Sequence, residues 1–383
     1  MTKVKLGDYV SLQTHKVDNI TAVNTSYVST ENLQPNKNGV LFPAASVPSS
    51  GKVNFYDVGD ILVSNIRPYF KKIWMAINPG THSSDVLNFR TKSPKLTQEY
   101  LYIVLESDSF FDYVTLTSKG TKMPRGDKDA IMDFEFSLPS LDVQQKISNT
   151  ILALERKILM SKQVNDNLLD LSMTHFEHWL ETTSSTNNVS LDEIATYKNG
   201  LAMQKFEPED GADSLPVLKI RELNQGFTDS SSNRARTDID ESVKVYDGDV
   251  IFSWSGTLLV DIWTGGSAGL NQHLFKVTST AYPKWFYYMW TRYHLRQFQQ
   301  IAAGKATTMG HIKRGDLKAA NVTIPTDSEF PQLETLLKPV VATYIENGVE
   351  IKNLQTIRDQ LLQKLHTQSE LVSLPEWSLL ASI

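Results

Sequence analysis

The sequence predicts an α+β protein: two mixed α/β globular regions separated by two long antiparallel helices, with an internal pseudo-twofold repeat. Residues 123–139 and 309–325 match in length without a gap, and both alternate apolar and polar residues into a closing proline. A long helical pattern follows each proline, and short apolar runs bounded by Gly, Pro, Asn and Ser precede it. One duplicated unit therefore makes up almost the whole chain.

The composition is that of an ordinary globular protein. The 383 residues allow two or three domains, the apolar fraction is 40% and the mean hydropathy is -0.28. No apolar run approaches the ~18 residues of a membrane helix, and the first residues lack the apolar stretch of a secretory signal. The chain has no cysteine, which excludes disulfides and fits a reducing compartment. We therefore expect a cytoplasmic protein.

The charge distribution limits how tightly the chain can bind nucleic acid by itself. The net charge is -5. Residues 1–141 carry 15 Lys and Arg against 14 Asp and Glu, and residues 181–330 carry 15 against 18. Neither region is strongly basic, so any DNA contact must come from local clusters, helped by the positive charge of a partner.

Residues 1–141 form the first predicted globular region. The apolar runs 60–63 and 72–77 are bounded by turn residues and predict short strands. Residues 98–111 space Leu, Ile and aromatic side chains as a helix does. The region is therefore mixed α and β.

Residues 142–180 predict one continuous helix, because they contain neither Gly nor Pro. At 1.5 Å per residue this helix is roughly 58 Å long, too long for one small domain, so it needs a partner helix. The residues that we expect to face this partner recur at nearly heptad spacing: Ile147, Ile151, Leu154, Ile158, Asn165 and Leu168.

The polar segment 181–188 opens the second globular region, residues 181–330, which again has short strands and an aromatic helix at 285–300. A distal helical pattern follows at 331–368, and the tail 369–383 has no clear pattern. Pro339 should kink or delay this helix and Gly348 should weaken it, so we expect an ordered core at 340–365. Its residues facing the first helix are Val340, Tyr344, Asn347, Ile351, Leu354, Leu361 and Leu365.

Two asparagines interrupt the apolar faces of these helices. Asn165 and Asn347 either fix the register of the pair, as single buried asparagines can, or only interrupt the seam. The sequence leaves both interpretations open.

Sequence signatures of catalysis are missing. We find no phosphate-binding loop, no dinucleotide or S-adenosylmethionine glycine fingerprint and no nucleophile elbow. The eight histidines do not cluster at metal-binding spacing. We therefore predict no catalytic residue and no metal ligand in this chain.

Several segments resemble the specificity (S) subunits of type I restriction–modification systems. Residues 138–147 resemble their strand-to-helix junction, and residues 357–365 resemble the end of their distal conserved helix. Residues 58–69, and residues 247–256 continued by 270–277, resemble two subtypes of their target-recognition domains. The resemblance covers about residues 1–368. The second junction, residues 324–332, departs from the pattern because it lacks the paired glutamines of the first.

The resemblance implies a non-catalytic subunit that binds double-stranded DNA. Target-recognition domain 1 (1–141) and target-recognition domain 2 (181–330) would each read half of a bipartite target. The central (142–180) and distal (331–368) helices would set the spacer. Two modification subunits would dock, carrying S-adenosylmethionine and methylating adenine. Restriction subunits would add cleavage with ATP and Mg. No cofactor is expected on this chain itself, and no membrane contact is expected.

Two duplicated loops are the candidate DNA-reading segments. They are basic, small and turn-rich, and such loops bring backbone N–H, hydroxyl and cationic groups to phosphates and base edges. The alternative is that they are solvated loops that merely turn the chain. The candidate residues are Lys119, Gly120, Thr121, Lys122 and Arg125, with Arg67 and Lys71, in the first region, and Gly304, Lys305, Thr307, Thr308, His311, Lys313 and Arg314 in the second.

Two other functions remain open at this point. The duplicated scaffold could serve a catalytically silent adaptor that binds protein instead of DNA. The chain could also be an enzyme whose site is assembled from distant residues that no motif reveals.

Overall fold

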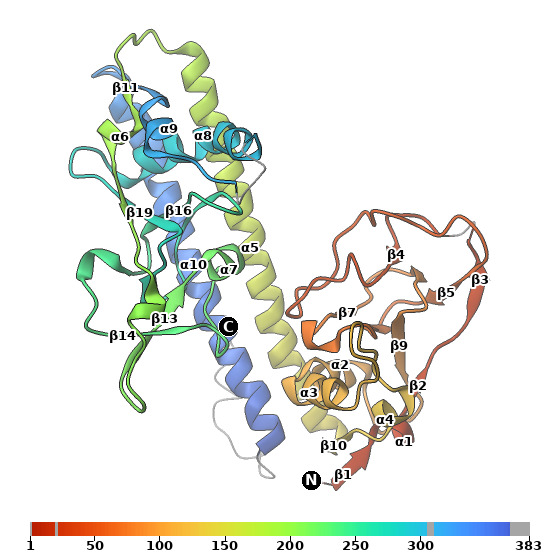
Figure 1. Ribbon diagram of the computed structural model, residues 1–383. Helices are drawn as coiled ribbons and strands as arrows, with labels where there is room; N and C mark the ends of the chain where they lie inside the picture. Colours follow the sequence, from red (N-terminus) through yellow and green to blue (C-terminus); the bar gives the residue numbers. More distant parts are fainter. Residues whose placement is uncertain (1, 20–21, 305–309, 368–383) are drawn as a thin grey trace. The chain divides into compact units, whose positions relative to one another are not determined.

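The computed structural model describes residues 2–19, 22–304 and 310–367, which form two compact units (Figure 1). Unit 1 contains the chain up to Arg156 together with the segment from Thr356 onward, and unit 2 is Lys157–Gln355. The long helices α5 (Leu141–Thr182) and α10 (Glu329–Thr367) contribute to both units.

Each unit is closed by pairing its first strand with its last. In unit 1, β1 (Thr2–Lys5) runs antiparallel to β10 (Glu135–Leu138). In unit 2, β11 (Asn188–Ser190) pairs in the same way with β20 (Asn321–Thr323). The alternating segments of the sequence repeat are these closing strands, and each leads through a proline toward a long helix.

The main sheets of the two units have the same strand order. Unit 1 has β2-β9-β6-β7 and unit 2 has β12-β19-β16-β17. A second four-stranded sheet lies in each unit, β3-β5-β8-β4 and β14-β13-β18-β15. The strands of unit 1 are β2 (Val10–Leu12), β3 (Lys16–Asp18), β4 (Tyr27–Val28), β5 (Lys52–Tyr56), β6 (Ile61–Ser64), β7 (Ile73–Met75), β8 (Gly80–His82) and β9 (Val86–Thr91). Those of unit 2 are β12 (Thr196–Asn199), β13 (Ser214–Leu218), β14 (Arg234–Arg236), β15 (Lys244–Val245), β16 (Val250–Ser253), β17 (Leu259–Ile262), β18 (Ala268–Leu270) and β19 (Leu274–Thr278).

The helix expected at 98–111 is two helices, α2 (Gln98–Glu106) and α3 (Asp108–Leu116). Ser107 divides them because its backbone is extended and its hydroxyl accepts the Phe110 N–H as an N-cap. The aromatic helix of unit 2, α8 (Lys284–Ala303), is continuous. The shorter helices are α1 (Leu6–Tyr9), η2 (Pro68–Phe70), α4 (Lys128–Met132), α6 (Leu191–Ile194), η3 (Met203–Lys205), α7 (Ile220–Gln225), η4 (Glu241–Val243) and α9 (Arg314–Lys318).

The long helices complete the core of unit 2. Phe176 and Trp179 of α5 pack with Trp290 of α8, and Leu333 and Leu337 of α10 belong to the same buried cluster. Helix α8 also contacts the main sheet, where Phe298 stacks on Phe252 of β16. The apolar stripes of α5 and α10 are thus buried against α8 as well as against each other.

The buried face of α5 follows the prediction only in its first half. Ile147, Ile151, Leu154, Ile158 and Asn165 are buried as expected. Further along, Leu168 is half-buried and its neighbour Leu169 takes the buried place. An α-helix has 3.6 residues per turn, so a face drawn at heptad spacing drifts by about 20° per heptad. The predicted position, Leu168, therefore lies one residue before the residue that is buried, Leu169.

Helix α10 begins earlier than the sequence predicted. It starts at Glu329 and passes through Pro339, so the ordered helix is not confined to 340–365. Proline removes one backbone hydrogen bond, but Leu337 and Val341 on either side are buried in the unit 2 core and hold the turn in place. Val341, not Val340, takes the buried position.

The other predicted partner-facing residues of α10 differ in burial. Ile351, Leu354 and Leu361 are buried, whereas Tyr344 and Asn347 are half-buried. The side chain of Leu365 and the tail 369–383 lie outside the described residues.

Gly348 has a packing role in α10 that the sequence did not reveal. A Cβ at this position would lie 2.6 Å from Oγ1 and 2.7 Å from Cγ2 of Thr264, in the segment that follows β17. Gly348 therefore allows α10 to approach the sheet of unit 2 closely, which outweighs its weak helix propensity.

We predict that Gly348→Ala destabilises the protein by about 1–3 kcal/mol, because the methyl group overpacks against Thr264. Gly315→Ala is the matched control: Gly315 lies in helix α9, and a Cβ there would meet nothing within 4 Å. The control should leave stability unchanged or raise it slightly. Equal thermal midpoints for the two variants would show that the close approach of Gly348 to Thr264 does not contribute to stability.

A buried acidic pair joins α2 to α5 in unit 1. Glu106 of α2 is 1% exposed, and Glu155 of α5 lies beside it. Burial, and next the neighbouring Glu106 carboxyl, raise the pKa of Glu155 well above its usual range, although Arg358 of α10 opposes this shift. One carboxyl of the pair is therefore held protonated where an exposed glutamate would be ionised.

The raised pKa of Glu155 predicts the direction in which folding stability changes with pH. Between the ordinary pKa of glutamate, about 4.3, and the raised folded value, the folded state binds a proton that the unfolded chain releases. Stability from this site should therefore fall as pH rises through that window. Glu155→Gln, which stays neutral, should flatten the decline of the thermal midpoint between pH 5 and 8. The exposed Glu99→Gln is the control and should retain the slope.

Candidate nucleic-acid interface

Three segments of unit 1 meet at one end of its main sheet. We name them loop cluster 1: the β6–β7 connection (65–72), the β8–β9 turn (83–85) and the basic loop (118–126). The Asn65 N–H donates to Asp85 O at 2.8 Å, and the Gly126 N–H donates to Asn65 O at 3.1 Å. The Arg67 N–H donates to Pro124 O at 2.8 Å. Backbone hydrogen bonds therefore fix the three segments to one another.

Unit 2 repeats this arrangement. We name loop cluster 2 the β16–β17 connection (254–258), the β18–β19 turn (271–273), Gly304 and residues 310–314. The Trp254 N–H donates to His273 O at 3.4 Å, the Gly256 N–H to Gly310 O at 2.8 Å and the Ile312 N–H to Trp254 O at 3.0 Å. These bonds join the residues that the sequence repeat places opposite those of loop cluster 1.

A side-chain bond is repeated as well. Ser64 Oγ donates to Ile66 O at 3.1 Å in unit 1, and Ser253 Oγ donates to Ser255 O at 3.2 Å in unit 2. The two clusters thus have the same pattern of hydrogen bonds to the backbone, and they differ mainly in their side chains.

The cations of loop cluster 1 are held in different ways. Lys119 forms an ion pair with Asp127, and Arg125 Nη1 lies 3.1 Å from Asp85 Oδ1. Lys71 Nζ is bound to Asp108 Oδ1 at 2.8 Å. Lys122 is exposed and forms no ion pair within the described part of the chain. Lys122 is thus the predicted cation most available to a ligand, and Arg125 is a guanidinium already oriented by a carboxylate.

Glycine and threonine shape the turn of the basic loop. Gly120 has a φ of +97°, a left-handed conformation that favours glycine, and Thr121 beside it is exposed. The turn brings Lys119 back against Arg125 in a short antiparallel bridge. The predicted residues of this loop therefore lie together on one projecting turn.

Arg67 and Lys71 bracket a strained bend. Both have a φ of +50°, on either side of the short helix η2. Such left-handed conformations cost roughly 1–2 kcal/mol for a non-glycine residue. The bend leaves Tyr69 and Phe70 47% and 39% exposed, with their rings 4.7 Å apart.

This aromatic pair was missed from the sequence. Aromatic rings next to cations are typical of surfaces that bind unpaired nucleotides, whose base faces are free for stacking. The interleaving of Arg67, Tyr69, Phe70 and Lys71 is the signal that could have revealed it.

Loop cluster 2 has aromatic and imidazole chemistry. The Trp254 ring lies 6.0 Å from the His273 ring and 6.4 Å from the His311 ring. The Ser255 hydroxyl is 2.9 Å from His273 Nδ1. His273 and the exposed Gln272 were not among the predicted residues, because the turn that carries them reaches the cluster only in the folded chain.

The predicted residues of loop cluster 2 have unequal roles. Lys313 is exposed at the start of α9. Arg314, by contrast, donates to Tyr197 O at 3.1 Å and lies over the Phe275 ring, so it anchors α9 to the sheet. Gly304 caps the end of α8. Lys305, Thr307 and Thr308 lie outside the described residues.

Between the helices, the structure brings the two asparagines together. Asn347 Nδ2 donates to Asn165 Oδ1 at 2.9 Å within unit 2. In the same unit, Lys157 of α5 pairs with Glu350 of α10 at 3.3 Å. From the first contact to the second, the residue number falls along α5 and rises along α10, as it must in antiparallel helices.

Residues 2–19, 22–304 and 310–367 contain no group of three or more His, Asp or Glu placed to hold a metal ion. No helix within these ranges is long and apolar enough to cross a bilayer.

Two matching loop clusters on a duplicated scaffold define a class of protein in which one domain is repeated and presents two related surfaces. The family model of the type I restriction modification DNA specificity domain matches residues 2–169 and again 184–353, so the chain belongs to this family. It is a DNA target-specificity subunit of a type I restriction–modification complex, with two recognition domains and no catalytic role.

Similar proteins agree with this assignment. The chain is 24% identical over 343 residues to the type I restriction enzyme MjaIX specificity subunit of Methanocaldococcus jannaschii, covering 82% of this chain and 78% of that protein. It is 26% identical over 189 residues to the EcoBI specificity subunit of Escherichia coli, covering 48% and 37%. The crystal structure of a type I S subunit from M. genitalium shares the fold, with a TM-score of 0.55 and 14% identity over 96% of each chain. The predicted fold class and family are confirmed.

Proposed function

We propose that loop cluster 1 reads one half of a split DNA target and loop cluster 2 reads the other. Target-recognition domain 1 would then be residues 1–141, and target-recognition domain 2 residues 181–330. The observation that carries this proposal is the repetition, bond for bond, of the three-segment backbone arrangement in both units. A surface that is duplicated with its backbone geometry intact has a function that both halves share.

The chemistry of loop cluster 1 suits both phosphates and bases. Lys122 and Thr121 offer a cation and a hydroxyl for the phosphate backbone. Arg125, oriented by Asp85, presents a planar guanidinium of the kind that binds guanine O6 and N7 in the major groove. The Tyr69 and Phe70 pair adds exposed aromatic surface at the edge of the cluster.

Loop cluster 2 carries different side chains on the same backbone. Arg125 corresponds to His311, and Asp85 corresponds to His273. Base recognition depends on the donors and acceptors that side chains present. The two half-sites should therefore differ in sequence, which makes the bipartite target asymmetric.

Partners would supply what this chain lacks. We infer that two modification subunits bind it, carry S-adenosylmethionine and methylate an adenine in each half-site. Where restriction subunits join, they would bring ATP- and Mg-dependent cleavage. Adenine methylation requires a base turned out of the helix into a pocket, and that pocket would belong to the modification subunit. The complex would act in the cytoplasm, on the DNA of the nucleoid.

We predict that the isolated chain binds DNA weakly and that its complex with a modification subunit binds one split sequence tightly. The reason is the near-balanced charge of both recognition domains, which leaves little nonspecific affinity. Binding to a library of split sites at physiological salt, with and without the modification subunit, measures the difference. Tight, specific binding by the chain alone would contradict the expected dependence on the partner. Binding to a protein partner with no DNA selectivity would favour an adaptor.

We predict that Lys122→Ala and Arg125→Ala weaken recognition of one half-site, and that Lys313→Ala weakens the other. Loss of a base contact should cost about 1–3 kcal/mol and relax specificity at one position. Loss of a phosphate contact should lower affinity for all sequences and reduce the salt dependence. The measurement is methylation of targets altered in one half-site at a time.

Lys95→Ala is the matched control for these variants. Lys95 is an exposed cation of unit 1 that follows the end of β9, whereas loop cluster 1 lies at the start of that strand. The control should methylate like the unaltered protein. If the three loop variants do the same, the clusters are not the reading surfaces.

A further inference from the structure

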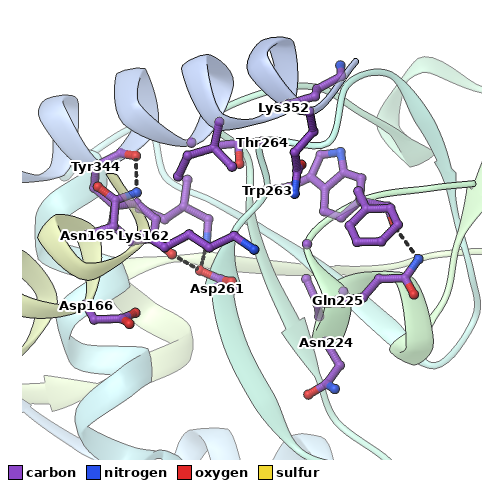
Figure 2. Close-up of a pocket in the computed structure, with 17 residues that line it drawn as sticks. Lys162, Asn165, Asp166, Asn224, Gln225, Asp261, Trp263, Thr264, Tyr344 and Lys352 are labelled. Atoms are coloured by element: carbon purple, nitrogen blue, oxygen red, sulfur yellow. Dashed lines mark hydrogen bonds between the residues drawn. The ribbon is translucent and has the colours of Figure 1, made fainter. Parts of the chain in front are cut away.

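In unit 2, α10 is joined to the main sheet by a partly buried polar contact. The Tyr344 hydroxyl, on α10, donates to Asp261 Oδ1, on β17, at 2.8 Å (Figure 2). The same carboxylate oxygen accepts the Ile262 N–H at 2.7 Å. Burial raises the pKa of Asp261, and these two donors offset part of that effect because they stabilise the ionised carboxylate.

The contact continues across the helix pair. Asn165 Nδ2, on α5, donates to the backbone carbonyl of the same Tyr344 at 3.0 Å. Asn347 Nδ2 then donates to Asn165 Oδ1 at 2.9 Å. One chain of hydrogen bonds thus runs from the sheet of the recognition domain through α10 to α5. We call Asp261, Tyr344, Asn165 and Asn347 the polar relay.

The relay restricts sliding of the helices. Moving α5 along α10 by one turn displaces Asn165 by about 5.4 Å, away from both of its partners. Asn165 is 7% exposed, so its amide would be left buried without a partner. The apolar residues of the seam impose no such penalty, because they repeat at similar spacing. A polar pair in an apolar seam fixes register in this way.

The relay also adds a directional contact to the apolar packing of Leu333, Leu337 and Val341 of α10 in the unit 2 core, and so contributes to the orientation of the recognition domain on the helices. A cavity of about 330 Å³ lies beside it, lined by Lys162, Asp166, Lys352 and the relay residues Asn165, Asp261 and Tyr344 (Figure 2). Apolar side chains, among them Leu223, Trp263 and Ile351, line the rest of the cavity, and at Gly348 the helix comes close to Thr264. The Tyr344–Asp261 bond is a directional contact that joins α10 to β17 beside this cavity.

We infer that the polar relay is a positioning device that fixes target-recognition domain 2 at one register and one angle on the helix pair, and so selects the spacer length of the split target. The inference rests on the proposed function. One additional base pair moves a half-site by about 3.4 Å and turns it by about 35°. A domain held by the relay cannot follow this movement, whereas a domain released from it can. Loss of the relay should therefore widen the range of accepted spacers without changing the half-site bases.

The test compares variants as complexes with the unaltered modification subunit. Tyr344→Phe removes the hydroxyl donor, and Asp261→Asn keeps an acceptor for it. The double variant Asn165→Leu with Asn347→Leu replaces the polar pair by an apolar one. The control is Lys157→Gln, which removes an ion pair between the same two helices that has no link to β17. Methylation rates are measured on DNA with both half-sites constant and the spacer lengthened or shortened one base pair at a time.

The expected readout is the ratio of rates on the preferred spacer and on its neighbours. Tyr344→Phe should lower this ratio about two- to tenfold, the range that corresponds to one hydrogen bond. Asp261→Asn and Lys157→Gln should keep it. The double leucine variant should lower the ratio while its thermal midpoint stays level or rises, because an apolar pair strengthens the seam but specifies register less.

Two results would overturn the inference in distinguishable ways. If Tyr344→Phe and the double leucine variant lose thermal stability but keep the original ratio, the relay is only structural and the proposed function stands. If the unaltered complex methylates no split target at any spacer, the proposed function fails and the inference fails with it.

Discussion

The fold depends on the burial of the apolar stripes of α5 and α10. Each helix is too long for one small domain to cover, so neither can exist alone in water with its stripe exposed. In unit 2 the stripes are covered partly by the partner helix and partly by α8, whose aromatic residues fill the space between helices and sheet. The position of the recognition domain therefore follows from the same packing that makes the helices stable. Within unit 2, a change in how the helices pack would therefore also change how the recognition domain is supported.

In the duplicated units, the backbone arrangement of the loop clusters is shared and the side chains differ. In each loop cluster, backbone N–H and carbonyl groups hold three segments together, and they do so at equivalent positions. Because the backbone supplies these bonds, the side chains can differ without loss of the arrangement. Arg125 and Asp85 in one cluster correspond to His311 and His273 in the other. Under the proposed function, such a scaffold would change its target by substitution in the loops while the sheets and helices remain the same.

The attachments of the two units to the helices are not copies of each other. Unit 1 places Glu106 of α2 against Glu155 of α5, with Arg358 of α10 nearby. Unit 2 joins β17 to the helices through Tyr344, and it packs Gly348 against Thr264. Both junctions bury polar groups, which are directional in a way that apolar contacts are not. The two units thus share an architecture, while the polar contacts at their junctions with the helices differ.

The sequence by itself determined the class of fold, the two long helices, the family and the location of the basic loops, because periodicity and turn residues report on local structure. It misplaced the buried face at Leu168 and Val340 by one residue, because the drift of a 3.6-residue turn depends on what the helix packs against. It took Pro339 and Gly348 as weak points, yet the helix passes through both. Only the tertiary structure showed that Gly348 allows a close approach, that Arg314 is an anchor and that the turns of Asp85 and His273 complete the loop clusters. These are contacts between residues far apart in the chain, and local patterns carry no record of them.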